Sequence, residues 1–402
     1  MIVLLLLAGC GAMATLTPCL GRVDDSTLKA RVLYLGDSSY APNKLVLQWI
    51  IAEPKFRIVI VPCDTYFIGL PEALRMTRLY LPRSYQALNA SQDIVIIHDI
   101  SPRIIPSNVL GFIHQAVRQE GLGLGLICFM FWGGTNEIAV WVSLAFYDAF
   151  PADVDLGTDI PSYLGRTYWS VVKRDPILNL PDIEKQPMQT LGNHGGDIWP
   201  RPGSVVHAVW KGRNTPVLVT GDYGAGKTLQ LGQGWHNPAS EVFQKYRYMP
   251  DLTYNQLYFL ADILPPEDLE LAHRARELFM DVRTRKSVTI STMEFVDKFG
   301  AKLDRIEEEL ARLGTDVVDA ERNYLEGDFA QAAEILKGIM GAYPTIEEHL
   351  ADLKNRTLMW IHLYEWISVV STGVICSMII WSLMIKRGLY RDVGITRLEQ
   401  AR

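Results

Sequence analysis

Cys128 and His236 are the two residues whose types suit covalent chemistry together. A thiol near the carboxyl end of a buried strand, with an imidazole from a later loop, is the arrangement of cysteine acyl-transfer enzymes. In such enzymes the histidine lowers the thiol pKa and transfers the proton. Cys128 lies in the apolar run of residues 121–134, which begins with alternate glycines and ends in a glycine pair. One hypothesis is therefore a thiol-dependent amidohydrolase or amidotransferase.

Other chemistry-bearing side chains follow predicted strands or occupy a glycine-rich loop. They are Asp37, His98, Asp99, His194 and Asp197. Because the carboxyl ends of parallel strands share one edge of a sheet, these groups are candidates for binding a metal ion or a small ligand. The alternative is structural, since such residues also close turns and cap helices. The five cysteines have the spacing of neither a zinc site nor a disulfide framework, and we predict no metal and no cofactor.

Residues 221–228 match the phosphate-loop pattern GxxxxGK[ST], with Lys227 and Thr228 at its end. That loop binds phosphates only where a helix begins at the lysine. Here residues 229–238 contain two glycines, an asparagine and a proline, which do not sustain a helix. We predict a β-hairpin that turns at residues 223–226, and nucleotide binding at residues 221–228 remains the alternative.

The first two thirds of the chain alternate between strand and helix patterns. Strands are predicted over residues 30–37, 56–64, 93–100, 121–134, 204–210, 215–220 and 228–232, and helices over 43–52, 109–119, 141–150 and 255–263. Nearly unbroken β-branched strands separated by helices indicate a parallel sheet with helices on both faces. The handedness of such crossovers favours a flavodoxin-like, doubly wound parallel sheet. We assign this α/β domain to residues 28–265.

The succession of these strands and glycines resembles the class I glutamine amidotransferase-like superfamily, and within it the uncharacterised amidotransferase-like and trehalose-utilisation-type branch. The segments that carry the resemblance are VLYLGD (32–37), DIVIIHD (93–99), GLICF (125–129), DPIL (175–178), PVLV (216–219) and GDYGAGK (221–227). The last segment looks like a hairpin in that family. The resemblance covers roughly residues 30–265 and predicts the fold better than the activity.

Catalytic amidotransferases resemble one another in a Gly-x-Cys-x-Gly elbow and a His-x-Glu pair. This sequence departs from both patterns, because no glycine lies two residues from Cys128 and no glutamate lies two residues after His236. The resemblance therefore implies a non-catalytic relative. In it Cys128 is a small hydrophobic residue of a buried strand, and the tip of that strand carries no reactive side chain.

After residue 265 the pattern is helical. Apolar residues spaced alternately three and four apart form a heptad seam over residues 296–324, which favours a partner helix in the same chain or in another subunit. A Gly-Asp pair then predicts a stop, a short returning helix over residues 329–340, and a further helix capped by Thr345. We assign residues 266–357 to a helical, coiled-coil-like stalk or hairpin.

Residues 367–385 contain no charged residue and are long enough to cross a bilayer as a helix. Aromatic residues that suit an interfacial belt precede this run and basic residues follow it: Trp360, Tyr364 and Trp366, then Lys386, Arg387 and Arg391. The positive-inside rule predicts a transmembrane helix within residues 358–386, a cytoplasmic tail at 387–402, and a large domain outside the cytoplasm. The alternative is a buried core helix.

Residues 1–20 contain an apolar run that ends in the A-x-A pattern of residues 12–14 and includes a lipobox-like segment at Cys10. We predict a signal peptide, with an uncleaved apolar segment as the alternative. The net charge of −6 gives no reason to expect nucleic acid as a partner. We predict a single-pass protein of the cell membrane whose amidotransferase-like domain is a non-catalytic binding or assembly subunit, with other subunits or a second copy as partners.

Overall fold

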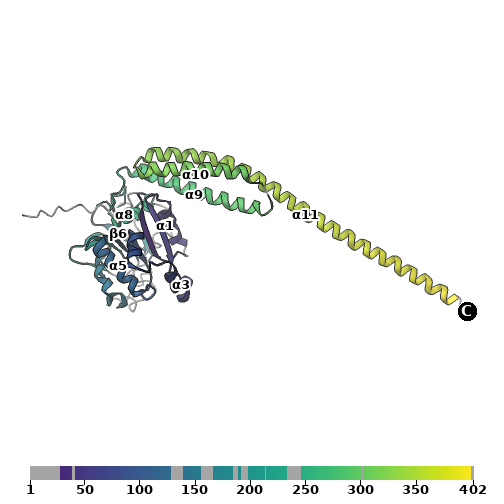
Figure 1. The fold of residues 1–402 in the computed structure, drawn as a ribbon, viewed down its shortest axis with the longest axis horizontal. Helices are drawn as coiled ribbons and strands as arrows, with labels where there is room; N and C mark the ends of the chain where they lie inside the picture. Colours follow the sequence, from purple (N-terminus) through teal and green to yellow (C-terminus); the bar gives the residue numbers. More distant parts are fainter. Residues whose placement is uncertain are drawn as a thin grey trace, which may run out of the picture. The chain divides into compact units, whose positions relative to one another are not determined.

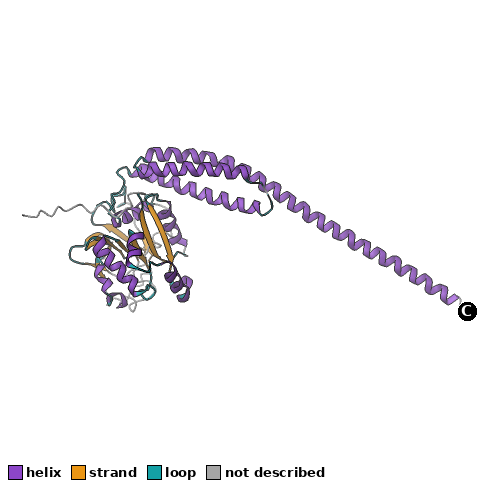
Figure 2. Cartoon of the chain, in the orientation of Figure 1, coloured by secondary structure: helices purple, strands orange, loops and turns teal. Residues whose placement is uncertain are grey.

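The computed structural model describes residues 28–38, 41–127, 139–154, 166–183, 189–191, 198–212, 214–232, 246–300 and 302–399. The chain divides into two compact units (Figures 1 and 2). Unit 1 comprises Met1–Met280 and Glu321–Gln331, and unit 2 comprises Asp281–Ala320 and Ala332–Arg402.

A mixed sheet forms the centre of unit 1. Its nine described strands follow the order β2-β1-β3-β4-β11-β10-β9-β6-β7. Their bounds are Ala30–Gly36 (β1), Phe56–Pro62 (β2), Ile94–His98 (β3), Gly123–Ile127 (β4), Arg166–Val171 (β6), Gln189–Leu191 (β7), Val205–Trp210 (β9), Pro216–Tyr223 (β10) and Gly226–Leu231 (β11). β5 (Ala152–Val154) and β8 (Ile198–Pro200) form a separate antiparallel pair.

Only one half of this sheet is parallel. β2, β1, β3, β4 and β11 pair in parallel, whereas β10, β9, β6 and β7 add to β11 in antiparallel pairs. The prediction of a parallel sheet is therefore confirmed for the first half and wrong for the second. The reason is local, because the two-residue turn between β10 and β11 reverses the chain and a hairpin pairs its strands antiparallel.

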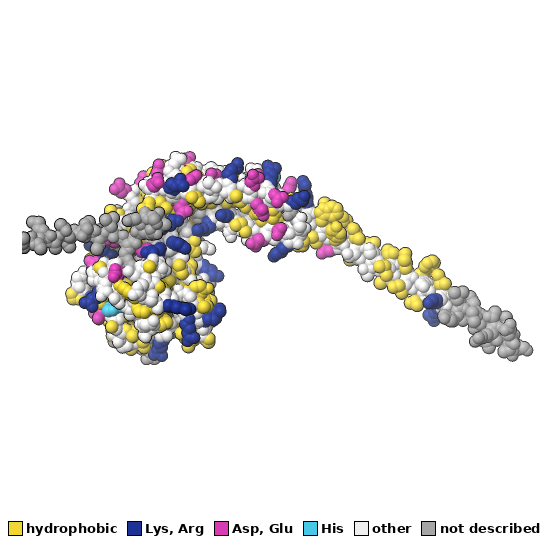
Figure 3. Space-filling view, viewed as in Figure 1, with side chains coloured by type: hydrophobic (Ala, Val, Ile, Leu, Met, Phe, Trp, Pro, Cys, Tyr) yellow, Lys and Arg dark blue, Asp and Glu magenta, His cyan; other side chains and the backbone are white. Residues whose placement is uncertain are grey.

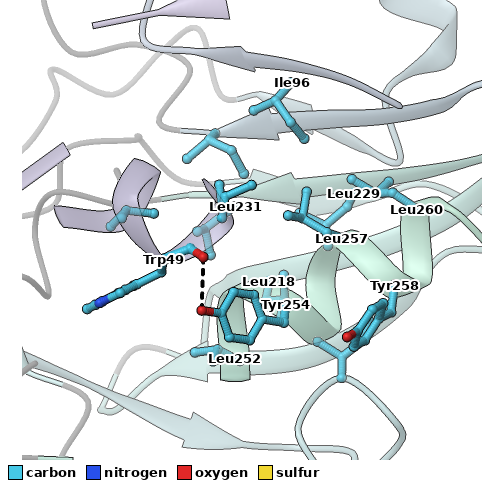
Figure 4. Close-up of a cluster of buried hydrophobic side chains, with 14 of the residues drawn as sticks. Trp49, Ile96, Leu218, Leu229, Leu231, Leu252, Tyr254, Leu257, Tyr258 and Leu260 are labelled. Carbon is cyan, nitrogen blue, oxygen red and sulfur yellow. Dashed lines mark hydrogen bonds between the residues drawn. The ribbon is translucent and has the colours of Figure 1, made fainter. Parts of the chain in front are cut away.

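Buried apolar clusters cover both faces of the sheet. Alternate residues of β1 enter them: Val32 lies in one cluster with residues of α1 (Ala41–Ala52) and α8 (Met249–Leu260), and Leu33 lies in the other. The second cluster includes residues of α3 (Leu70–Tyr80), α4 (Tyr85–Ser91) and α5 (Ser107–Glu120). Figure 4 shows part of the first cluster, in which the Tyr254 hydroxyl donates to the Trp49 carbonyl oxygen at 3.0 Å. The period-two alternation thus specifies two packed faces.

β4 occupies the middle of the sheet, and all five of its residues are buried. Its alternate glycines allow close packing: a Cβ on Gly123 would lie 2.2 Å from the carbonyl oxygen of Leu260 in α8, and one on Gly125 would lie 2.5 Å from Ile96. The buried strand predicted within residues 121–134 is thus confirmed over Gly123–Ile127. Residues 128–138, with Cys128, lie outside the described residues.

Three long helices follow the sheet domain. Residues of the first two take part in a buried ionic cluster within unit 1. The helices are α9 (Leu269–Asp297), α10 (Asp304–Leu325) and α11 (Phe329–Glu399). Arg276 of α9 donates to Glu53, to Asp251 at 2.5 Å and to the Tyr324 hydroxyl at 2.8 Å. His273 Nδ1 lies 2.5 Å from the Asp251 carboxylate, and all of these side chains are buried. Buried charges are stable only when they are paired in this way, so the cluster joins α9 and the end of α10 to the sheet domain.

The predicted helices of the stalk differ from the observed ones in two places. The seam over residues 296–324 is not one helix, because α9 ends at Asp297, Gly300 adopts a φ of 77°, and α10 begins at Asp304. The two helices predicted after residue 328 are one helix, α11, which continues through Pro344. Burial of Tyr343 and Ile346 on either side of the proline holds the helix where one backbone hydrogen bond is lost.

Unit 2 buries apolar positions of all three helices within one chain. Val296 of α9, Ile306 and Leu313 of α10, and Leu350 of α11 are buried. Arg285 of α9 also donates to Glu347 of α11 at 2.9 Å. The seam of α10 is therefore covered within the chain.

The distal part of α11 exposes large apolar side chains. Among the described residues, α11 alone is long and apolar enough to cross a membrane, judged by length and composition, and its most apolar window contains no buried residue. Figure 3 shows apolar side chains along this part of the helix, with basic side chains beyond them. In the sequence the apolar run is followed directly by Lys386 and Arg387. This segment is therefore a candidate membrane span and is not a core helix of the chain.

Candidate functional site

Polar side chains gather at the carboxyl edge of the parallel half of the sheet, which comprises the ends of β1, β2 and β3 and the residues that follow. The register defines this edge, because Gly36 pairs with Pro62 on one side and with His98 on the other. The polar side chains are Tyr34, Asp37, Cys63, Asp64, His98 and Asp99. Since open α/β sheets bind ligands at this edge, it is the candidate site.

Tyr34 and His98 form the buried centre of the carboxyl edge. The Tyr34 hydroxyl donates to the Asp37 carbonyl oxygen at 2.9 Å and lies 2.6 Å from Nδ1 of His98. Each side chain is about 1% exposed. Since the hydroxyl has only one proton to donate, Nδ1 of His98 is the donor to Tyr34, and Nε2 of a neutral imidazole carries the lone pair. His98 is thus oriented by Tyr34.

The ionisation of the Tyr34 hydroxyl is suppressed. Burial raises its pKa well above the ordinary value, and the negative charge of Asp37, with smaller effects of Cys63, Asp99 and Asp64, raises it further. Tyr34 therefore remains a hydrogen-bonding group at neutral pH and is no acid–base catalyst there.

Close backbone packing holds His98 and Asp99 in place. A Cβ on Gly36 would lie 2.7 Å from the carbonyl oxygen of His98, so only glycine fits beside β3. Asp99 has a φ of 51° and donates its backbone N–H to the Ile127 carbonyl oxygen of β4 at 3.0 Å. Aspartate tolerates this left-handed conformation better than most residues. The aspartate thus turns the chain at the strand end.

Cys63 is the thiol of the carboxyl edge that the structure describes. It is fully buried, and its backbone N–H donates to the Gly36 carbonyl oxygen at 3.2 Å. Burial, reinforced by the charge of Asp64, raises the pKa of the thiol. Because the thiolate is the nucleophilic form, Cys63 is inert at neutral pH.

The structure brings together three of the predicted site residues, Asp37, His98 and Asp99, at one edge. The remaining four lie outside the described residues: Cys128, His194, Asp197 and His236. Among the described residues, no group of three His, Cys, Asp or Glu side chains is arranged to hold a metal ion.

Residues 221–228 form a hairpin, as predicted, and no helix begins at Lys227. Tyr223 pairs with Gly226, and the Lys227 ammonium lies 2.9 Å from the Asp222 carboxylate on the facing strand. A Cβ on Gly224 would lie 2.1 Å from the Arg118 carbonyl oxygen, so the turn packs directly on α5. A phosphate loop needs the free N–H groups of a helix N-terminus, and this segment lacks them.

An Asp-His-Thr relay in the antiparallel half, with His207 and Thr220 buried and Asp175 partly buried, was missed from the sequence. Asp175 Oδ2 lies 2.5 Å from Nδ1 of His207, and His207 Nε2 lies 2.6 Å from the Thr220 hydroxyl. Burial opposes ionisation of Asp175, but His207 and the backbone N–H groups of Ile177 and Leu178 lower its pKa overall. The connectivity is that of a hydrolase triad, yet Thr220 is only 2% exposed. We therefore assign the relay a structural role, in which it holds the segment at Asp175 against β9 and β10. No sequence signal reveals it, because the contact depends on strand register.

No family model and no curated protein matches this sequence. Several solved structures are similar over part of the chain, among them the following three. Cytoplasmic Protein STM1381 from Salmonella typhimurium LT2 is 18% identical, with a TM-score of 0.47, and the match covers 57% of this chain and 99% of that one. Cytoplasmic Protein STM3548 from Salmonella typhimurium is 20% identical, with a TM-score of 0.46, over 57% and 98%. The exo-beta-1,4-mannosidase Op5Man5 from Opitutaceae bacterium strain TAV5 is 12% identical, with a TM-score of 0.33, over 58% and 36%. Likenesses at this level carry no information on activity.

Proposed function

We propose that this chain is a single-pass membrane protein whose amidotransferase-like α/β domain acts as a non-catalytic binding or assembly subunit of a membrane complex. The observation that carries the proposal is the distal part of α11. There large apolar side chains such as Trp366, Ile375 and Trp381 are more than half exposed, a state that water disfavours and a lipid bilayer satisfies.

The strand order supports the proposed flavodoxin-like relationship. In the parallel half, β2-β1-β3-β4-β11 corresponds to the order 2-1-3-4-5, in which a flavodoxin-like sheet is wound. A hairpin at Tyr223–Gly226 is also what the family resemblance leads us to expect, and β10 and β11 pair there in antiparallel fashion.

The chemistry of the carboxyl edge supports a non-catalytic role. Tyr34 and His98 are hydrogen-bonded to each other inside the domain, and the Cys63 thiol is protonated. Groups held in this way stabilise the edge, but they supply no nucleophile.

The flanks of the apolar segment support an orientation. Lys386 and Arg387 follow it directly, and Glu365 precedes it. By the positive-inside rule we place residues 387–402 in the cytoplasm and the α/β domain outside.

A pair of lysines inside the apolar segment tests the anchor. We expect Val374→Lys/Met378→Lys to move the full chain from the carbonate-washed membrane fraction to the soluble fraction, because each charge at the bilayer centre costs about 2.5–3.5 kcal/mol. The control Ala351→Lys/Asn355→Lys adds the same charges at the same spacing to α11 outside the apolar segment and should remain in the membrane. Equal membrane retention of the two variants would refute the anchor.

Glutamine hydrolysis tests the non-catalytic assignment. We expect the detergent-solubilised chain to release no ammonia from glutamine, and Cys128→Ser to behave like the unaltered chain. Ammonia release that is lost in Cys128→Ser would instead establish the thiol-dependent amidohydrolase with Cys128 and His236.

A further inference from the structure

Two arginines near the end of α3 have no acidic partner among the described residues. Residues 65–91 contain three arginines and a single acid, Glu72, which accepts hydrogen bonds from Arg75 at 2.6 and 2.8 Å. In the described part of the chain neither Arg78 nor Arg83 forms an ion pair, and both side chains are exposed. This end of α3 therefore attracts anions.

Apolar side chains project from the same place. Leu79 and Tyr80 are each 55% exposed, while α3 buries Ala73 and Thr77 inside unit 1. A leucine and a tyrosine between two arginines match a membrane interface, where tyrosine lies among the headgroups and arginine extends its charge to the phosphates. An acidic peptide would match the arginines but leave Leu79 and Tyr80 in water.

A groove of about 340 Å³ lies beside these residues, between the end of α3 and the start of α5. Its lining includes Arg78 and Arg83, the apolar side chains of Leu81 and Val109, and the amide of Asn108. Ligand sites in proteins begin at about 300 Å³, so the groove has room for one phospholipid headgroup.

We propose that Arg78, Leu79, Tyr80 and Arg83 form a docking surface for the anionic phospholipids of a bilayer. A lipid phosphate lies in the groove against the two guanidinium groups, and Leu79 and Tyr80 enter the headgroup region. Charge complementarity and the exposed apolar pair carry the proposal. It goes beyond the membrane anchor and does not depend on it, because the whole surface belongs to unit 1.

Hydrogen exchange on the full chain tests this docking surface. The chain is held in nonionic-detergent micelles doped with either phosphatidylglycerol or phosphatidylcholine. We expect phosphatidylglycerol to slow amide exchange over residues 76–84, and phosphatidylcholine to have no such effect. Arg78→Gln/Arg83→Gln should weaken the apparent affinity for phosphatidylglycerol about thirtyfold, which is about fivefold for each arginine.

The matched control is Arg305→Gln/Arg312→Gln, which removes two exposed arginines from α10 and should leave the protection unchanged. Equal exchange with both lipids, or full protection in Arg78→Gln/Arg83→Gln, would overturn the proposal. Protection by inorganic phosphate alone or by polyglutamate alone would also overturn it, in favour of a free-anion site or a peptide site. Because micelles hold the chain whether or not α11 spans a bilayer, failure here differs from failure of the anchor.

Discussion

Hydrogen-bond partners decide what individual polar residues can do in this molecule. Asp37, His98 and Asp99 were predicted at one sheet edge because strand ends can be located from apolar runs. The partner that orients His98, Tyr34, could not be predicted, because it reaches His98 across the β1–β3 register. For the same reason the relay between Asp175, His207 and Thr220 could not be predicted, because the sequence does not show which strands pair. Residue types are visible in a sequence, whereas contacts between strands depend on pairing.

Asp175 gives a prediction about pH. Its pKa is lowered in the folded chain, so its stabilising effect is complete above the ordinary carboxyl pKa and is lost as pH falls through the lowered value. We expect Asp175→Asn to lower the free energy of unfolding by about 1–3 kcal/mol at neutral pH and to differ little from the unaltered chain in strong acid.

Denaturant unfolding of the detergent-solubilised chain across pH measures this difference. The control is Asp352→Asn, which removes an exposed carboxylate from α11. We expect this variant to leave the free energy of unfolding unchanged at every pH. If the free energies of unfolding of Asp175→Asn and the unaltered chain differ by the same amount from neutral to acid pH, then His207 does not stabilise the ionised Asp175 carboxylate, and the assigned role is contradicted.

The hairpin could be predicted from residues close in sequence, whereas the boundaries of the helices depend on packing between distant residues. The turn at Gly224 needs only residues close in sequence, and it was found. The heptad spacing of apolar residues continues in phase across Gly300, although α9 ends before this glycine and α10 begins after it. A prediction from periodicity alone therefore gave one helix where the structure has two. The predicted helix start at Thr345 is wrong, because α11 continues through Pro344 with Tyr343 and Ile346 buried on either side. The predicted helix over residues 141–150 is likewise divided, with a 3₁₀ turn at Ala145–Ala149.

The buried ionic cluster gives a prediction about the junction of α9 with the sheet domain. Arg276→Met leaves the carboxylates of Glu53 and Asp251 buried without their main partner. Breaking such a buried pair costs about 3–5 kcal/mol, so we expect a loss of this size in the free energy of unfolding. Arg305→Met, on an exposed face of α10, should change it by less than about 0.5 kcal/mol. Equal effects would show that the cluster does not stabilise unit 1.

For the whole molecule, the sequence predicted an α/β domain, a helical region and one apolar helix, because composition changes sharply along the chain. From the sequence, the α/β domain was predicted to end at residue 265 and the stalk to begin at residue 266. The boundary lies inside the helices, at Met280, Ala320 and Gln331, since Arg276 and Tyr324 belong to the sheet domain through their buried partners. Side-chain pairing, which leaves no pattern in the sequence, determines that boundary.

Labelling of Cys376 tests the central claim most directly. This native cysteine is exposed on α11 at the middle of the apolar segment. In intact membranes we expect a charged, water-soluble maleimide to leave Cys376 unmodified, because a charged reagent does not enter the hydrocarbon of the bilayer. The same reagent should rapidly modify an Asn355→Cys variant, as read by mass spectrometry of the peptides. Modification of Cys376 as fast as the cysteine introduced by Asn355→Cys would place the apolar segment in water and contradict the account.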